Sequence, residues 1–259
     1  MRKYLAIARI GFMERVAYRG DVFGRSIMLL LFLFVLSRLW GSVLTGAGSE
    51  GFDHTAVVWY FVITEGLMLA SPGLGQQINQ EVRSGSFAAY LIRPCQYVLF
   101  HLGSYMGKTA MGLTVNLAVG SLVALWLVGL PLFRVVELPL IGLSVILGLV
   151  INFLITMSIS LTSFWIEDNE PFFWIFSKFQ LILGGVLIPL DFFPGLLKAI
   201  ATKLPFGYIF YRPARLCVSF SSTEALSVLS GQFLWISLLA LMTFVIFEAG
   251  VKRVNVNGG

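Results

Sequence analysis

The chain has 259 residues, of which 58% are hydrophobic and only 12% are charged, against roughly 25% charged residues in an ordinary soluble domain. A soluble globule of this size hides at most about 75% of its surface, which is too little for so much apolar area. The composition excludes soluble, disordered and collagen-like proteins and indicates an integral membrane protein. The net charge of +5 is not carried by a basic run interleaved with aromatic residues, so we expect no nucleic-acid partner.

Hydropathy predicts an all-α, polytopic protein whose six membrane spans form a single transmembrane domain over residues 1–259. Each span is close to the ~20 apolar residues that cross a bilayer. The fifth is the weakest, because Lys178, Gly184, Gly185 and Pro189 interrupt it. No polar stretch is long enough for a second, ATP-binding domain. The predicted spans are residues 26–45, 56–75, 104–129, 138–165, 172–190 and 226–248.

Residues 2–21, before the first span, predict an amphipathic helix that lies on the membrane surface rather than crossing it. Arg9 interrupts its apolar arc and would have to extend its charged end toward water. A basic flank that only sets the topology is the alternative. At 100° per residue, the apolar arc contains Leu5, Ala6, Ile10, Phe12, Met13, Val16 and Ala17.

The distribution of basic residues predicts that both termini are cytoplasmic. With six spans in this orientation, twelve Lys and Arg residues fall on the inner side and six on the outer side. Cys95 would then be inside and Cys217 outside, so the two cysteines should not form a disulfide. The outer basic residues, which run against the rule, are Arg38, Arg134, Lys198, Lys203, Arg212 and Arg215.

Motifs for nucleotide binding, catalysis and metal binding are not found. Residues 103–109 read GSYMGKT, one residue short of a P-loop, and their small residues favour a helix-packing face instead. His54 and His101 fall on opposite sides of the membrane. The acidic residues Glu167, Asp168 and Glu170 are typical of a solvated loop. We therefore expect no enzymatic activity, no metal and no cofactor in this chain.

Glu65 is the one carboxylate deep inside a predicted span. A charge at this depth is costly and usually faces a bundle interior or a water-filled path. Two interpretations remain open, a residue of a translocation path and a protonated or hydrogen-bonded residue that fixes helix packing. Pro72 and Gly73, further along the chain, permit a kink where this span leaves the membrane.

The inner segment between the second and third predicted spans, residues 76–94, is polar first, then apolar, and ends in Arg93-Pro94. This pattern predicts a short helix parallel to the inner face that displays Glu81 and Arg83 to the cytoplasm. Such a segment could dock a partner protein, and a simple connecting loop is the alternative.

Two motifs resemble the permeases of type-2 ABC transporters, most closely a bacterial branch described as drug or viologen exporters. The run Glu81-Val-Arg83-Ser84-Gly85-Ser, followed by Leu91-Ile-Arg93-Pro94, is similar to the family's segment between spans two and three. The run Gly184-Gly-Val-Leu-Ile-Pro189-Leu-Asp-Phe-Phe-Pro194, followed by Leu204-Pro205-Phe206 and Tyr211-Arg-Pro213, is similar to its fifth span and outer re-entrant segment.

The resemblance implies a permease with an inner coupling helix and an outer gate in the bacterial inner membrane. It implies two copies of an ATP-binding cassette ATPase, which would hold ATP and Mg, and a second permease subunit, identical or related. It assigns ATPase coupling to Glu81, Arg83, Ser84, Gly85, Arg93 and Pro94. It assigns the outer gate to Pro189, Phe192, Phe193, Pro194 and Pro205, and the position of Glu65 inside a span makes it the candidate residue of the translocation path.

The sequence thus favours an ATP-driven exporter of an amphipathic or lipid-like compound that works by alternating access between two faces of the membrane. An aromatic, apolar path with few charges is the basis for this substrate class. An ion- or proton-coupled carrier or channel, with Glu65 as its titrating group, is the alternative. A scaffold protein that transports nothing is a third hypothesis.

Overall fold

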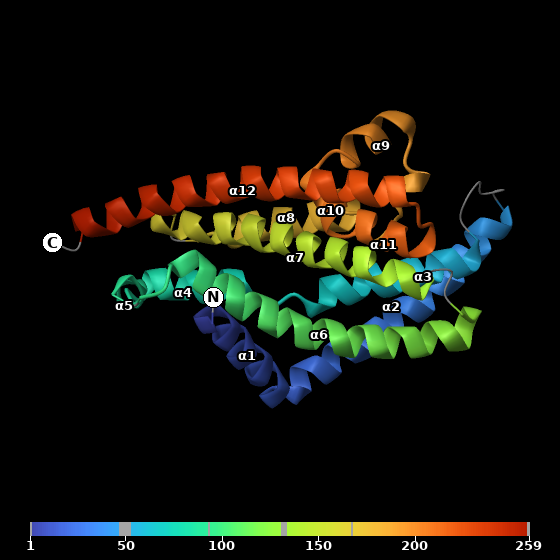
Figure 1. The fold of residues 1–259 in the computed structure, drawn as a ribbon, viewed down its shortest axis with the longest axis horizontal. Helices are drawn as coiled ribbons and strands as arrows, with labels where there is room; N and C mark the ends of the chain where they lie inside the picture. The colour runs from blue at the N-terminus through green and yellow to red at the C-terminus, as the bar shows by residue number, and fades with distance from the viewer. Residues whose placement is uncertain (1, 47–52, 93, 131–133, 167, 258–259) are drawn as a thin grey trace.

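The computed structural model describes residues 2–46, 53–92, 94–130, 134–166 and 168–257, and all regular structure in this part of the chain is helical. The all-α prediction is confirmed. Figure 1 shows the long helices running beside one another along the longest axis of the molecule. They are α2 (Arg19–Gly46), α3 (His54–Ala70), α6 (Tyr97–Val128), α7 (Leu138–Leu161) and α12 (Ser222–Asn257).

Five segments of the described chain are long and apolar enough to cross a membrane. They correspond to the first four predicted spans and the sixth. One of them joins α3 to α4 (Leu74–Arg83), and another includes the short helices η1 (Val135–Glu137) and η2 (Thr162–Phe164) at either end of α7. The five segments are Gly20–Leu44, His54–Arg83, Tyr97–Val128, Val135–Phe164 and Ser222–Arg253.

The predicted fifth span, residues 172–190, is not one continuous helix. Helix α8 (Glu170–Ile182) has 13 residues, about 20 Å at 1.5 Å per residue, which is shorter than the ~30 Å hydrocarbon core of a bilayer. The helix stops because Gly185 adopts a left-handed backbone (φ 73°), which favours glycine, and Pro189 follows. The chain then continues through η3 (Leu190–Phe192), α9 (Gly195–Ala201), α10 (Pro205–Ile209) and α11 (Tyr211–Val218).

The amino-terminal segment forms α1 (Arg2–Ala17), which ends before α2 instead of continuing to residue 21 as predicted. Figure 1 shows α1 and α2 meeting in a V, with α1 folded back along α6. The predicted apolar arc stays on the outside, where Leu5, Ile10 and Met13 are more than half exposed. The other face packs closely on α6, because a Cβ atom at Gly107 would collide with the carbonyl of Ala8. The predicted small-residue packing face is confirmed.

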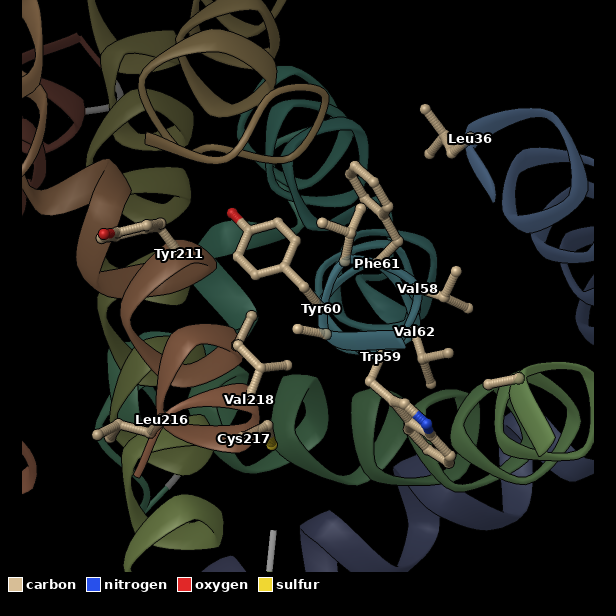
Figure 2. Packing of buried hydrophobic residues seen from close by; sticks show 14 of the residues in the cluster. Leu36, Val58, Trp59, Tyr60, Phe61, Val62, Tyr211, Leu216, Cys217 and Val218 are labelled. Carbon is tan, nitrogen blue, oxygen red and sulfur yellow. The ribbon is translucent and has the colours of Figure 1, made fainter. Parts of the chain in front are cut away.

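The core is centred on α3, most of whose side chains are buried. Figure 2 shows its residues 58–62 lying between Leu36 of α2 and the α11 residues Tyr211, Leu216, Cys217 and Val218. A second apolar cluster fills the other half of the molecule between α4, α5 (Phe87–Leu91), α6, α7 and α12. The short helix α11 is therefore a core element that packs directly against a membrane-crossing helix.

Candidate functional site

The predicted coupling segment, residues 76–94, falls largely on α4 and α5, which form a helical hairpin rather than a single surface helix. Helices α4 and α5 are joined by a turn in which Gly85 has φ 72°, a left-handed conformation that glycine adopts without strain. The hydroxyls of Ser84 and Ser86 lie 2.9 Å apart and help to close this turn. Pro94 is exposed beyond α5, and Arg93 lies outside the described residues.

Glu81 is buried at the joint between this hairpin and α6. Its Oε2 atom accepts a hydrogen bond from the hydroxyl of Tyr97 at 2.9 Å and lies 3.1 Å from Nε2 of His101. Its Oε1 atom accepts from the amide of Gln77 at 2.9 Å and from the hydroxyl of Tyr90 at 3.2 Å. The expectation that Glu81 is displayed to the cytoplasm is wrong, because four polar groups from α4, α5 and α6 surround its carboxylate.

The exposed side of the hairpin carries Arg83, Ser84 and Gly85. Arg83 forms no ion pair with any residue that the structure describes. It borders a groove of about 460 Å³ between α4 and the start of α8. Asn79 donates a hydrogen bond to Asn169 across the floor of this groove (3.1 Å), and Glu170 lines its other side. The groove offers amides, a cation and a carboxylate to a docking partner.

A belt of neutral polar side chains crosses the interior between α3, α6, α7 and α8. The amide of Asn152 donates to the hydroxyls of Tyr105 (2.9 Å) and Ser71 (3.2 Å), and Gln180 donates to the Asn152 carbonyl oxygen (2.8 Å). These residues line a cavity of about 220 Å³, together with phenyl rings that include Phe176. The sequence interpretation missed this polar belt, although single amides inside apolar runs at Asn152 and Gln180 were its signal.

Glu65 lies on α3 and is only 5% exposed. It forms no hydrogen bond or ion pair with another residue in the described part of the chain. The packing interpretation therefore requires a protonated Glu65, because the described residues offer no hydrogen-bond partner. A carboxylate in this position is costly to ionise, because burial removes its hydration and no charge replaces it.

The outer segment, residues 183–221, begins at a turn that α3 helps to hold. The hydroxyl of Tyr60 donates a hydrogen bond of 2.5 Å to the carbonyl oxygen of Gly185, which has the left-handed backbone. Pro189 follows the turn, and the ring of Phe192 packs on Trp40 of α2 with centroids 4.6 Å apart. This part of the predicted gate therefore lies against α2 and α3.

The other predicted gate residues take different positions. Phe193 is half-buried, and Pro194 is exposed immediately before α9. Pro205 is buried at the first position of α10. The structure thus brings residues 189–194 together, and Glu65 lies further along α3 from Tyr60, the residue that contacts the turn.

Asp191 is the centre of an ion-pair cluster in this outer segment. One carboxylate oxygen lies 2.5 Å from Nη1 of Arg215 and 3.5 Å from Nζ of Lys198. The other accepts a hydrogen bond from the hydroxyl of Tyr211 at 3.0 Å. Burial alone would lower the pKa of Arg215, but Tyr211, Asp191 and Glu224 raise that pKa above its usual range. The cluster ties η3 and α9 to α11 and to the start of α12, where Glu224 lies.

Neither Cys95 nor Cys217 forms a disulfide. Burial raises the pKa of the Cys217 thiol to about 12, so almost none of it is thiolate at neutral pH. No group of three His, Cys, Asp or Glu side chains among the described residues could hold a metal ion.

Comparison with known protein families gives one match over most of the chain. Residues 23–258 match the family model described as ABC-2 family transporter protein. A comparison with curated proteins finds none that matches this chain.

Proposed function

The chain belongs to the ABC-2 transporter family, and on this premise we propose that it is the membrane-spanning permease subunit of an ATP-driven exporter. The observation that carries the proposal is the joint between the coupling segment and α6. A motor outside the membrane can do work on a helical bundle only through a rigid part, and Glu81 fixes α4 and α5 to α6 through its contacts with Tyr97 and His101.

Two copies of an ATP-binding cassette ATPase are the proposed partners, and ATP and Mg belong to those chains. Each ATPase would dock on the exposed side of the coupling segment, where Arg83 borders the polar groove. Because α4 continues α3 through residues 71–73, a force on α4 reaches α3 as well as α6. The proposed complex contains a second permease subunit, identical or related, which completes the path.

The outer segment is proposed to be a re-entrant outer gate. Its support is the depth that α10 reaches, since the carbonyl oxygens of Tyr208 and Ile209 lie directly over Gly148, near the middle of α7. In this proposal, the short helix α8 and the outer segment together form the fifth of six membrane spans. We propose that the protein lies in the inner membrane of a bacterial cell and that both of its termini are in the cytoplasm.

The proposed substrate is an amphipathic or lipid-like compound, such as a drug, a lipid or a glycoconjugate. The interior cavity supports this class, because Asn152, Gln180 and Tyr105 offer neutral hydrogen-bonding groups beside the ring of Phe176. An alternating-access cycle would open this region to each face in turn, with ATP binding shifting the balance between the two states.

Glu65 favours a second candidate, an ion- or proton-coupled carrier that needs no ATPase. An unpartnered carboxylate buried in a span is the kind of group that binds a proton or cation during transport. The candidate differs from the first in its energy source, so it predicts transport in sealed vesicles without ATP.

Purification of the tagged full-length chain from its native membranes tests the two candidates. The first predicts a co-purifying ATPase and vanadate-sensitive ATP hydrolysis, both reduced by Arg83→Glu. A chain that lacks an ATPase partner and moves substrate along an imposed proton gradient would replace the first candidate with the second. Absence of both activities would support the scaffold hypothesis.

A further inference from the structure

A further polar pocket, which we call the elbow pocket, lies where α1 and α2 meet. It has a volume of about 260 Å³ and is lined by residues of the α1–α2 elbow, of the junction between α3 and α4, and of α6. Arg15, Tyr18, Gln77, Ser104 and Lys108 are among its lining residues. It shares no lining residue with the groove beside Arg83, and it adjoins the cavity beside Asn152, with which it shares Pro72, Gly73, Leu74 and Tyr105.

Arg15 lines the elbow pocket and carries hydrogen-bonding groups that no described residue satisfies. Its side chain is 11% exposed, and Nη1 pairs with Asp21 at 2.9 Å. Its Nε and Nη2 atoms are shielded and have no hydrogen-bond partner within the described chain. Because shielded donors cost free energy when unpaired, this half of the guanidinium group is suited to an anionic acceptor. Burial and the neighbouring Arg25 lower the pKa of Arg15, although Asp21 raises it, so a bound anion would stabilise the charged form.

The charges at the elbow pocket leave one positive charge uncompensated. Lys108, whose side chain is 16% exposed, pairs with Glu14 at 2.9 Å. Arg25 shares Asp21 with Arg15 and also donates to the carbonyl oxygens of Leu69 and Ser71. Arg15 and Lys108 therefore line the pocket with Glu14 and Asp21, and Arg25, which lies beside the pocket, adds a third cation to these two carboxylates. A ligand with a single negative charge would balance this group of charges.

Helix α4 adds a further attraction for an anion. It has ten residues, its first residue Leu74 lines the elbow pocket, and no side chain caps its N-terminus. The free N–H groups at a helix start carry partial positive charge and commonly hold phosphate groups. This feature acts together with the unpaired nitrogens of Arg15.

The surroundings of the elbow pocket point to a lipid as the source of the anion. The first membrane-crossing segment begins at Gly20, directly after the elbow. Tyr18 on the pocket wall and Phe23 on α2 are each 68% exposed, and aromatic side chains are enriched at membrane–water interfaces. We propose that the elbow pocket binds one singly charged phosphate diester, supplied by the headgroup of a phospholipid whose acyl chains lie along the exposed apolar face of α2.

The test uses the full-length chain, purified and stripped of lipid in a neutral detergent. Phosphatidylglycerol is the probe, diacylglycerol with the same acyl chains is the control without phosphate, and inorganic phosphate is the control without lipid. Arg15→Gln removes the cation of the site, and Arg9→Gln is the matched control on an exposed position of the same helix. Retained lipid is counted by native mass spectrometry, and ligand affinity is measured from the rise in Tm.

We expect phosphatidylglycerol to be retained by the wild-type chain and by Arg9→Gln, and to bind Arg15→Gln about tenfold or more weakly. Diacylglycerol should give no saturable effect. A saturable rise in Tm with inorganic phosphate alone would show that the site takes free phosphate and would overturn the lipid source. Equal retention of phosphatidylglycerol by wild type and both variants would overturn the site itself. If Arg15→Gln fails to fold, Lys108→Gln takes its place, because this change leaves the Arg15–Asp21 pair intact. Its retention of phosphatidylglycerol is then compared with that of the wild-type chain in the same way.

Discussion

Glu81 and His101 lie 3.1 Å apart, carboxylate to imidazole, in the buried joint between α4 and α6. This contact spans twenty residues of sequence and joins a helix of the coupling segment to a membrane-crossing helix. The aromatic rings of Tyr90 and Tyr97 enclose it, with the Tyr97 ring centroid 4.5 Å from that of His101. The joint is therefore rigid as well as polar, which is what transmission of force from a partner requires.

Removal of the Glu81 carboxylate should destabilise the chain. Glu81→Ala leaves three donors from Tyr90, Tyr97 and Gln77 without their acceptor, and each unsatisfied buried group costs about 1–3 kcal/mol. We expect a clear fall in Tm of the purified full-length chain and a smaller fall for Glu81→Gln, which keeps an acceptor. Gln80→Ala, an exposed change one residue away, is the control. A Tm of Glu81→Ala equal to that of the control would show that the network adds nothing to stability.

Charge reversal at Arg83 should separate docking from folding. Arg83 is exposed and unpaired among the described residues, so we expect Arg83→Glu to leave the Tm and the membrane yield unchanged. We expect it to weaken ATPase association several-fold, because a charge-assisted contact becomes a repulsion. Co-purification of the ATPase measures this effect. Arg38→Glu, an exposed substitution at the opposite end of the molecule, should have no effect. Normal ATPase binding by Arg83→Glu would show that the exposed side of α4 is not part of the docking surface.

Periodic and local features of this fold were predictable from the sequence. The five long helices follow from runs of about 20 apolar residues, and the break after α8 follows from Gly184, Gly185 and Pro189, which interrupt the predicted fifth span. The packing of α1 on α6 follows from small residues at 103 and 107. Each of these signals lies in a short stretch of the chain, although the residue packed on Gly107, Ala8 of α1, is distant in sequence.

Features that depend on distant partners were not predictable. Nothing around Glu81 indicates that Tyr97 and His101 of another helix will surround it. The contact that holds the turn after α8 comes from Tyr60, 125 residues before Gly185, and nothing near Gly185 in the sequence indicates it. Likewise, Lys198 and Arg215 fall on the predicted outer side, although basic residues are usually in excess on the cytoplasmic side. In the structure both residues pair with Asp191.

Substitutions at Glu65 should distinguish charge from size. Glu65 is buried without a partner, so Glu65→Gln keeps the shape of the side chain and should preserve folding and membrane yield. Glu65→Lys places an unpaired cation in the span and should cost about 2.5–3.5 kcal/mol on insertion. Membrane-inserted yield measures this cost. An assay of ATP-dependent transport by Glu65→Gln then tests whether ionisation of Glu65 is needed. Loss of transport with a normal membrane yield would show that ionisation of Glu65 is part of the transport cycle. Equal yields for both variants would mean that Glu65 faces water.

Loss of the Asp191 charge should loosen the outer segment. Asp191→Asn weakens the contacts with Lys198 and Arg215, which together hold η3 and α9 to α11. Cys217 of α11 reports the change. It is buried with a thiol pKa of about 12, so the wild-type chain should react very slowly with a membrane-impermeant maleimide.

Opening of the segment should rehydrate Cys217 and lower the pKa of its thiol toward the usual value of about 8.5. Because hydration favours the thiolate and access allows the reagent in, we expect labelling of intact cells to increase at least tenfold in Asp191→Asn. All variants carry Cys95→Ser, which leaves Cys217 as the one cysteine of the chain. Glu137→Gln, a carboxylate substitution away from the ion-pair cluster, is the matched control. Labelling of Asp191→Asn at the control rate would show that the hydrophobic packing of α11 on α3 holds the outer segment without the ion pairs.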